Sequence, residues 1–173
     1  MSVVSNTTVI SNFAAIGRLD VLEQLFGTLF IPTDVYSEIE AGLEEGYTFY
    51  QGIDQLVRPI NPSGWLRLTS VSNDREIAAL VALPAELHAG ERACLVIGAE
   101  RGWLVLTDDA AARRQARLMR IHLSGSIGCL VNACRGDILS VDDANACLNA
   151  MMAAGYRSPV SDLNALLGVD PRD

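Results

Sequence analysis

A short apolar run that ends in two adjacent aspartates constrains the fold of this chain more than any other stretch. Residues 104–107, Leu-Val-Leu-Thr, precede Asp108 and Asp109, and a segment rich in alanine and arginine follows. Such a run is typical of a buried strand in a parallel sheet, and the segment after it is typical of a helix. The stretch therefore predicts a strand whose carboxyl end leads directly into a helix, which is where open α/β sheets bind ligands.

The two aspartates carry adjacent negative charges that repel each other unless something offsets them. A helix N-terminus, an arginine or a divalent cation would do so. In a purely structural interpretation, one aspartate caps the helix, the other lies in its first turn, and Asp109 pairs with Arg113 one turn later. In a functional interpretation, the pair belongs to a metal site. The positions of the other acidic residues decide between the two.

The rest of the chain alternates strands with helices, which predicts an α/β fold with a parallel sheet. The irregular segment 44–62 suggests a further helix with an exposed aromatic flank, interrupted before Pro59. With 173 residues, one domain is expected. Strands are predicted at 3–5, 28–31, 65–71, 104–107 and 121–123, and helices at 9–16, 19–26, 33–41, 75–83, 91–100, 110–119, 127–134, from about 143 to 154, and at 158–167.

Composition excludes several classes of function. The net charge is −8, which disfavours a large nucleic-acid footprint without sequence preference. All 13 basic residues are arginine, which excludes lysine Schiff bases and Walker-type phosphate loops. The four cysteines form no C-x-x-C pair. Because no apolar run approaches about 18 residues and no basic segment opens the chain, we expect a cytoplasmic protein without a membrane span.

Parallel topology should bring acidic residues from distant segments to one edge of the sheet. Right-handed crossovers place the start of each strand-following helix at the carboxyl edge. Asn6 ends the first strand, Glu38 lies in the second turn of the helix after the second strand, and Glu91 opens the helix that precedes residue 104. Taken singly, Glu38 fits a solvated helix position and Glu91 a favourable charge at a helix N-terminus. Together with the aspartate pair, they form a set of oxygen ligands that suits Mg²⁺ or Mn²⁺.

Four short motifs occur in an order that resembles PIN-domain nucleases. The resemblance is closest to an uncharacterised PIN-like branch related to the toxin nucleases of bacterial toxin–antitoxin systems. It runs from the first strand to about residue 136, and more loosely to residue 156. The motifs are Ser-Asn-Thr-Thr at 5–8, Val-Tyr-Ser-Glu-Ile at 35–39, Leu-His-Ala-Gly-Glu-Arg-Ala at 87–93, and Thr-Asp-Asp at 107–109 with Ala112-Arg113.

The resemblance implies a three-layer α/β/α PIN-like fold with a parallel five-stranded sheet. It implies a single PIN-like domain over residues 1–173, with a core at about 1–136 and C-terminal helices at about 140–168. It further implies frequent homodimers, cleavage of RNA that depends on Mg²⁺ or Mn²⁺, and an antitoxin protein as a partner. Glu38, Glu91 and Asp109 match acidic positions of the family, with Asp108 beside them.

Asn6 departs from the family pattern, in which an aspartate usually ends the first strand. An amide oxygen can coordinate a metal, but it carries no charge and cannot act as a base. The site should therefore bind metal more weakly. Two functions are favoured, and another metal-dependent phosphohydrolase is the lesser alternative. In one, a metal-dependent endoribonuclease uses Asn6, Glu38, Glu91 and Asp109 as ligands, while Asp108 orients water or lies behind the ligands. In the other, the chain is a catalytically impaired PIN-like binding or assembly module.

Arginines cluster on the predicted helix 110–119. Arg114, Arg117 and Arg120 could contact an RNA backbone, although a solvated helix face accounts for them equally well. Arg113 is expected to be the structural partner of a site carboxylate, and contact with a substrate phosphate is the lesser alternative. The turn at 125–128 is expected to join a strand to a helix rather than to cradle a phosphate.

Overall fold

The computed structural model of the chain describes residues 1–168. Its six strands are all parallel and form one sheet in the order β3-β4-β2-β1-β5-β6. The central strand β1 pairs with β5 through Val4 and Val105 and with β2 through Val4 and Phe30. The strands are β1 (Val3–Ser5), β2 (Leu29–Pro32), β3 (Val57–Arg58), β4 (Leu66–Thr69), β5 (Leu104–Leu106) and β6 (Leu123–Ser124).

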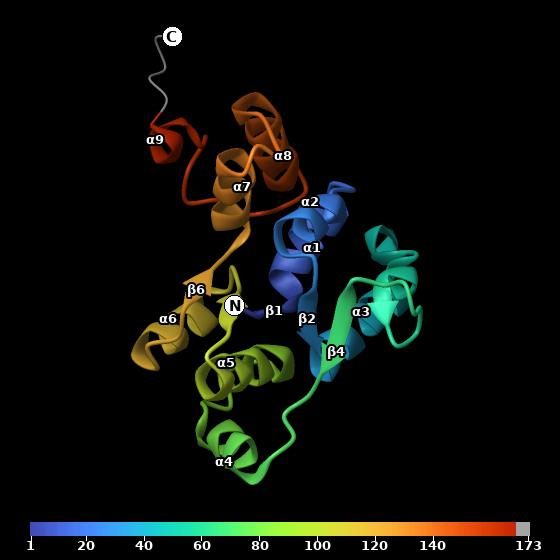
Figure 1. The fold of residues 1–173 in the computed structure, drawn as a ribbon, viewed down its shortest axis with the longest axis vertical. Helices are drawn as coiled ribbons and strands as arrows, with labels where there is room; N and C mark the ends of the chain where they lie inside the picture. The colour runs from blue at the N-terminus through green and yellow to red at the C-terminus, as the bar shows by residue number, and fades with distance from the viewer. Residues whose placement is uncertain (169–173) are drawn as a thin grey trace.

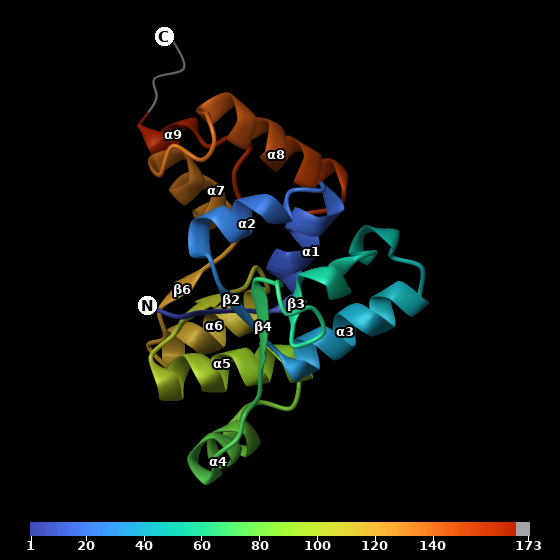
Figure 2. The ribbon, with the colours of Figure 1, turned by 45° about the vertical axis from the view of Figure 1, so that its right-hand side comes forward.

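Helices cover both faces of the sheet. They are α1 (Thr7–Ala15), α2 (Leu19–Phe26), α3 (Thr33–Glu44), α4 (Asp74–Ala82), α5 (Ala89–Arg101), α6 (Ala110–Leu118), α7 (Ser126–Arg135), α8 (Val141–Ala153) and α9 (Asn164–Leu167). One layer holds α1, α2 and α7, with α8 packed on α7, and the opposite layer holds α3, α5 and α6, with α4 packed on α5 (Figures 1 and 2). This is the expected three-layer α/β/α fold.

The expectation of five strands was wrong by one. The extra strand, β3, has only two residues and follows two short 3₁₀ helices, Thr48–Tyr50 and Ile53–Leu56. These replace the longer helix predicted for the segment 44–62. A strand of two residues has no side-chain alternation to detect, and the apolar residues of this segment satisfy either structure.

Strand β6 also begins later than predicted. The N–H of Ile121 donates to Ala116 O at 2.9 Å, so this residue still belongs to the end of α6. Arg120 adopts a positive φ of 56° and reverses the chain there. The strand therefore occupies 123–124 instead of 121–123. None of the helices within residues 1–168 is long and apolar enough to cross a membrane.

The apolar strands are buried because both faces of the sheet are covered. Val4, Val105 and Leu106 are fully buried, and so is Val35 on α3. Helix α5 lies close to the sheet because residue 98 is glycine: a Cβ at this position would collide with Cγ2 of Val105. Because α5 packs this closely on the sheet, its N-terminus is held at the carboxyl edge.

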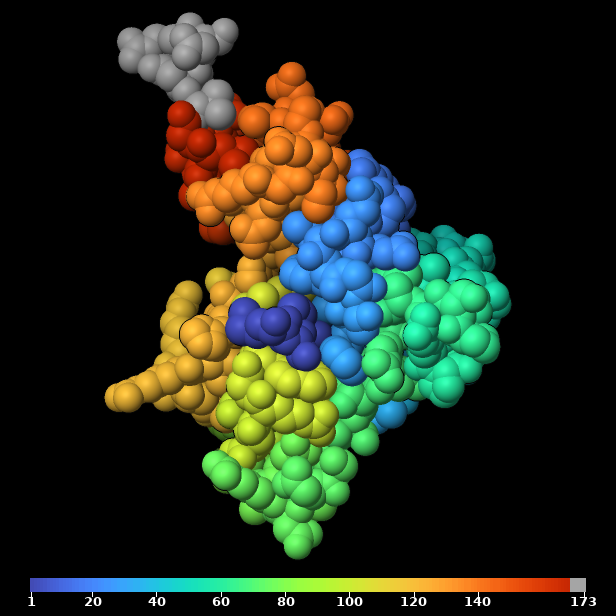
Figure 3. All heavy atoms as spheres, in the orientation of Figure 1, coloured from blue at the N-terminus to red at the C-terminus, as the bar shows by residue number. Residues whose placement is uncertain are grey.

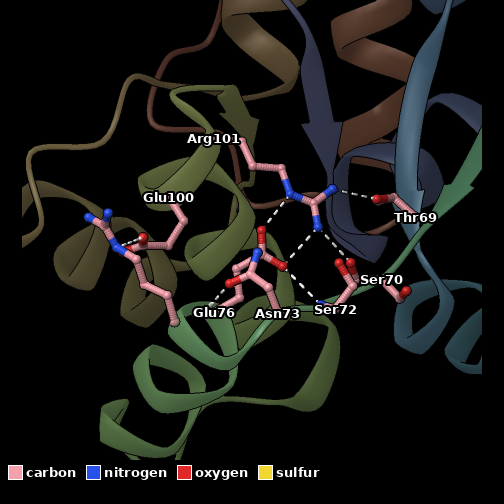
Figure 4. A network of polar contacts seen from close by, with 8 residues as sticks. Thr69, Ser70, Ser72, Asn73, Glu76, Glu100 and Arg101 are labelled. Atoms are coloured by element: carbon pink, nitrogen blue, oxygen red, sulfur yellow. Dashed lines mark hydrogen bonds and ion pairs between the residues drawn. The ribbon is translucent and has the colours of Figure 1, made fainter.

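A buried ion pair ties α4 to α5. Arg101 donates from Nε to Oε1 of Glu76 at 2.7 Å and from Nη2 to Oε2 at 2.9 Å, and its Nη1 donates to Thr69 Oγ1 at 2.9 Å (Figure 4). The side chain of Glu76 is only 2% exposed. The hydrogen bond from Arg101 lowers the pKa of Glu76 from 4.5 to about 2, helped by the backbone N–H of Ser72 and opposed by burial.

We expect Glu76→Gln to lower the free energy of unfolding by about 2–3 kcal/mol at pH 7, because it leaves the Arg101 charge without its partner. The pKa of Glu76 is lower in the folded state than in the unfolded state. Its contribution is therefore complete above pH 4.5 and is lost as the pH falls toward about 2. Urea unfolding from pH 7 down to about 2 should show the difference between the two proteins shrinking in acid.

Glu100→Gln is the matched control, because it removes the ion pair between Glu100 and Arg75, whose side chain is 84% exposed. Exposed pairs contribute about 0–1 kcal/mol. Equal losses for the two variants at pH 7 would contradict the role given to the Glu76–Arg101 pair.

Candidate functional site

The carboxyl ends of β1 and β5 lie side by side, and α1 and α6 begin there. The two strands are in register through Ser5 and Leu106, and the N–H of Asn6 donates to Leu106 O at 3.0 Å. Helix α3 directly follows the neighbouring strand β2, and it packs against both α1 and α5. Parallel topology thus gathers the starts of α1, α3 and α6 at one edge.

Asn6 is the buried centre of this edge, with an exposed fraction of 1%. Its Nδ2 donates to Thr107 Oγ1 at 2.6 Å. Its Oδ1 accepts from the backbone N of Thr8 at 3.1 Å and from the Thr8 hydroxyl at 2.7 Å, so Asn6 caps α1. Both lone pairs of the amide oxygen are therefore engaged within the chain. A metal contact through this oxygen requires that one of these bonds be released.

Glu38 joins the starts of α1 and α5. Its Oε1 accepts from the backbone N of Gly90 at 3.0 Å, and its Oε2 accepts from the Thr7 hydroxyl. Residue 90 must be glycine for this approach, since a Cβ there would lie 2.8 Å from Glu38 Oε1 and 2.8 Å from Val35 Cγ2. The carboxylate of Glu38 is thereby held at the edge.

Glu91 and Asp109 both lie at helix N-termini on this edge. Oε2 of Glu91 accepts from the backbone N of His88 at 3.0 Å, and Oδ1 of Asp109 caps α6 by accepting from Ala112 N at 2.7 Å. Glu91 is 8% exposed. Burial raises its pKa, the His88 N–H opposes the shift, and the negative charges of Asp109 and Glu38 raise it further. The charges of Asp109 and Glu38 thus act on Glu91. We call these three carboxylates the carboxylate edge.

Asp108 points away from the carboxylate edge. Its Oδ1 accepts from Ser126 N at 3.0 Å and from Tyr156 OH at 3.4 Å. Its Oδ2 accepts from Ser126 Oγ at 2.6 Å and from Asn12 Nδ2 at 3.0 Å. Burial and the charge of Asp108 raise the pKa of Tyr156 well above its usual value, so the tyrosine stays a hydrogen-bond donor. The adjacent aspartates are thus separated by pointing at different helix N-termini, Asp108 at α7 and Asp109 at α6.

The expected pairing of Arg113 with a site carboxylate was wrong. Nη1 of Arg113 donates to the backbone oxygens of Thr107 at 2.8 Å and Ser124 at 3.2 Å. The ion pairs formed within residues 1–168 involve other residues. Arg113 lies close to its two backbone acceptors because they end adjacent strands, and it therefore holds β5 and β6 together at the carboxyl edge.

The donor chemistry of the carboxylate edge fits a hard divalent cation. Each carboxylate has about four lone-pair sites, so the hydrogen bonds described above leave oxygens available to a metal. No basic side chain of the described chain forms an ion pair with Glu38, Glu91 or Asp109. However, no three His, Cys, Asp or Glu side chains of residues 1–168 are grouped closely enough to hold an ion. The three carboxylates would have to approach one another to coordinate one.

Several residues of the site were not predicted. Thr8 donates from its hydroxyl to Asn6 and accepts from Asp108 N at 3.0 Å, while Thr107 Oγ1 accepts from both Asn6 and Asp109 N. Thr7 and Thr8 belong to the Ser-Asn-Thr-Thr motif, but the sequence does not indicate which residues they contact. Tyr156 is 48 residues from Asp108, and no spacing rule connects them.

A comparison with protein families identifies the fold. The model of the family DUF3368, described as a PIN domain, matches residues 2–168. The chain belongs to the PIN-domain family. Membership indicates a nuclease-type function in general, and PIN domains generally bind nucleic acid and use divalent metal ions. No curated protein and no solved structure matches the chain.

We expect Glu91→Gln to stabilise the metal-free protein at pH 7 by about 0.5–2 kcal/mol, the range of typical stabilising changes. Glutamine keeps an oxygen to accept the His88 N–H and removes a buried charge repelled by Asp109 and Glu38. The pKa of Glu91 is higher in the folded state than in the unfolded state, so wild type loses stability as the pH rises through that pKa. The gain should therefore shrink in acid.

Thermal unfolding in EDTA at several pH values measures this gain. Glu23→Gln on α2 is the control, because it removes the same charge from an exposed position. A Glu91→Gln protein that is less stable than wild type at pH 7 would show that Glu91 is a stabilising cap instead of a strained ligand.

Proposed function

We propose that the chain is a metal-dependent endoribonuclease whose carboxylate edge holds Mg²⁺ or Mn²⁺. The observation that carries the proposal is the buried Glu91, which lies at the same edge as Glu38 and Asp109 and forms no ion pair within residues 1–168. A buried carboxylate without a cationic partner lowers stability, and such perturbed groups are characteristic of functional sites. Membership of a nuclease family supports the same conclusion.

A divalent ion at the carboxylate edge would supply a more acidic water and would neutralise charge that develops on the phosphate. The chain itself would position the carboxylates through fixed donors. Gly90 N–H and the Thr7 hydroxyl hold Glu38, while the starts of α5 and α6 hold Glu91 and Asp109. These hydrogen bonds keep the three carboxylates at one edge of the sheet before RNA or metal binds.

Asn6 and Asp108 act, in this proposal, as positioning residues. Asn6 links α1 to Thr107, and Thr107 in turn accepts from the backbone N of Asp109. Asp108 fastens the β5–α6 junction to α1, α7 and Tyr156. Both residues therefore set the place of Asp109. A direct metal contact by Asn6, and the orientation of water by Asp108, remain predictions from the sequence.

The second candidate is a catalytically impaired PIN-like module that binds a partner without cleaving RNA. Two observations favour it: the engaged oxygen of Asn6, and the spread of the carboxylates, which across residues 1–168 form no group able to hold an ion.

Under either function, we propose a cytoplasmic homodimer. As a nuclease, the chain would be the toxin of a toxin–antitoxin pair, whose antitoxin offers basic side chains to the carboxylate edge. The order of the four motifs supports the homodimer and the antitoxin partner.

Cleavage of a structured RNA pool separates the two functions. We expect wild type to cleave with Mn²⁺ and not with EDTA, and Asp109→Asn to reduce the rate by about 10²–10³-fold. Asparagine preserves the cap on α6, so the loss reports the missing charge and not a frayed helix. Asp142→Asn, an exposed change in the first turn of α8, is the control and should cleave normally.

Asn6→Asp completes the series. If wild type cleaves, this variant should reach the same rate at a lower Mn²⁺ concentration, because it adds a negative charge to the edge. If Asn6→Asp cleaves RNA and wild type does not, the natural chain is the catalytically impaired module. Cleavage in EDTA, or full activity of Asp109→Asn, would contradict the metal-dependent mechanism.

A further inference from the structure

A groove of about 610 Å³ lies between α6, the start of α7 and the segment after α8. Three arginines line it, Arg113 and Arg117 from α6 and Arg157 from the segment after α8, and we call it the arginine groove. The outline in Figure 3 is hollowed between α6 and the C-terminal segment. The apolar part of its wall includes Leu123, Ile127 and Val160.

We propose that the arginine groove binds the sugar–phosphate backbone of a single RNA strand beside the carboxylate edge. This assignment rests on the proposed nuclease function for the identity of the strand. Arg117 and Arg157 contact phosphates, while the apolar wall contacts sugars and bases. The groove would therefore decide which part of an RNA reaches the carboxylates.

The charge of the groove favours a polyanion. The chain carries a net charge of −8, yet the groove contains three arginines and one acidic residue, Asp108. The carboxylate of Asp108 already accepts four hydrogen bonds from Ser126, Asn12 and Tyr156. None of the three arginines forms an ion pair within the described part of the chain. The groove thus presents unpaired positive charge on an acidic protein, which a phosphate backbone would neutralise.

The position of the groove connects it with the carboxylate edge. Asp108 lines the groove, and Asp109, the next residue, belongs to the carboxylate edge. Asp109, Arg113 and Arg117 are spaced four residues apart, about 6 Å along a helix axis for each step, and lie near one face of α6. A strand that crosses the β5–α6 junction therefore meets the carboxylates first and the arginines next.

The size of the groove favours a single strand. Its volume lies within the range of about 300–1,000 Å³ that is usual for small-ligand sites, which suits one or two nucleotides and not a duplex. Arg114 and Arg120 do not line it. The sequence offered Arg114, Arg117 and Arg120 as possible contacts to RNA. Of these three, only Arg117 lines the groove and is placed to contact the strand.

Fluorescence anisotropy with a labelled single-stranded 12-mer RNA, in EDTA to prevent cleavage, tests the proposal. We expect Arg117→Gln/Arg157→Gln to bind at least 10-fold more weakly than wild type at low salt. The slope of log affinity against log salt should become shallower by about 1.4, which is about 0.7 for each lost phosphate contact on a single strand. Both side chains are exposed, so the variant should unfold at the wild-type temperature.

Arg114→Gln/Arg120→Gln is the matched control, because it removes the same charge from α6 and its C-terminal turn, outside the groove. We expect less than a threefold loss of affinity and an unchanged slope. Equal losses for the two double variants, or no RNA binding by wild type, would overturn the proposal. A poly-glutamate peptide is a further test. If it binds wild type as tightly as the RNA does, and binds Arg117→Gln/Arg157→Gln more weakly, the groove is a site for an acidic protein segment and the proposal is overturned.

The result is independent of whether the chain cleaves RNA. If RNA binding depends on Arg117 and Arg157 but the chain does not cleave RNA, the proposal for the groove is supported and the nuclease function is contradicted. If the chain cleaves RNA and Arg117→Gln/Arg157→Gln binds RNA as wild type does, the nuclease function is supported and the proposal for the groove is contradicted.

Discussion

The hydrogen bond from Asn6 to Thr107 joins segments that are 101 residues apart, and the arrangement of the site depends on it. Thr107 Oγ1 also accepts from Asp109 N, and Thr8, which donates to Asn6, accepts from Asp108 N. An amide suits this place because it donates to Thr107 and accepts from Thr8 at once. A carboxylate could only accept, so Thr107 would have to reverse its hydroxyl. The neighbours of Asn6 are therefore arranged to suit an amide at this position.

The carboxylate edge combines firm positioning with unfavourable charge. Backbone N–H groups and a threonine hydroxyl hold Glu38, Glu91 and Asp109, while burial and mutual repulsion raise the pKa of Glu91. The surrounding fold maintains this arrangement through apolar packing and the remote Glu76–Arg101 pair, which fastens the far end of α5. Stability is thus supplied away from the edge, and the edge retains charge that a cation would neutralise.

The sequence predicted the layers of the fold and the edge at which acidic residues gather, because both follow from the strand at 104–107 and from parallel topology. It did not predict contacts that depend on side-chain direction. Asp108 and Asp109 are adjacent, yet one faces α7 and the other the carboxylate edge. Arg113 bonds to backbone oxygens instead of a carboxylate, and β3 is too short to leave a pattern. The spacing of apolar residues along the chain indicates which side chains are buried. The direction of a polar side chain depends instead on the residues that surround it in the folded protein.

Binding of Mn²⁺ by isothermal titration calorimetry tests the central claim that the carboxylate edge holds a divalent ion. Wild type should bind Mn²⁺ with a micromolar to millimolar Kd, and Glu91→Gln and Asp109→Asn should each weaken binding at least 10-fold. Asp142→Asn should bind as wild type does. Absence of binding at millimolar Mn²⁺, or equal binding by all four proteins, would contradict a metal site at the carboxylate edge.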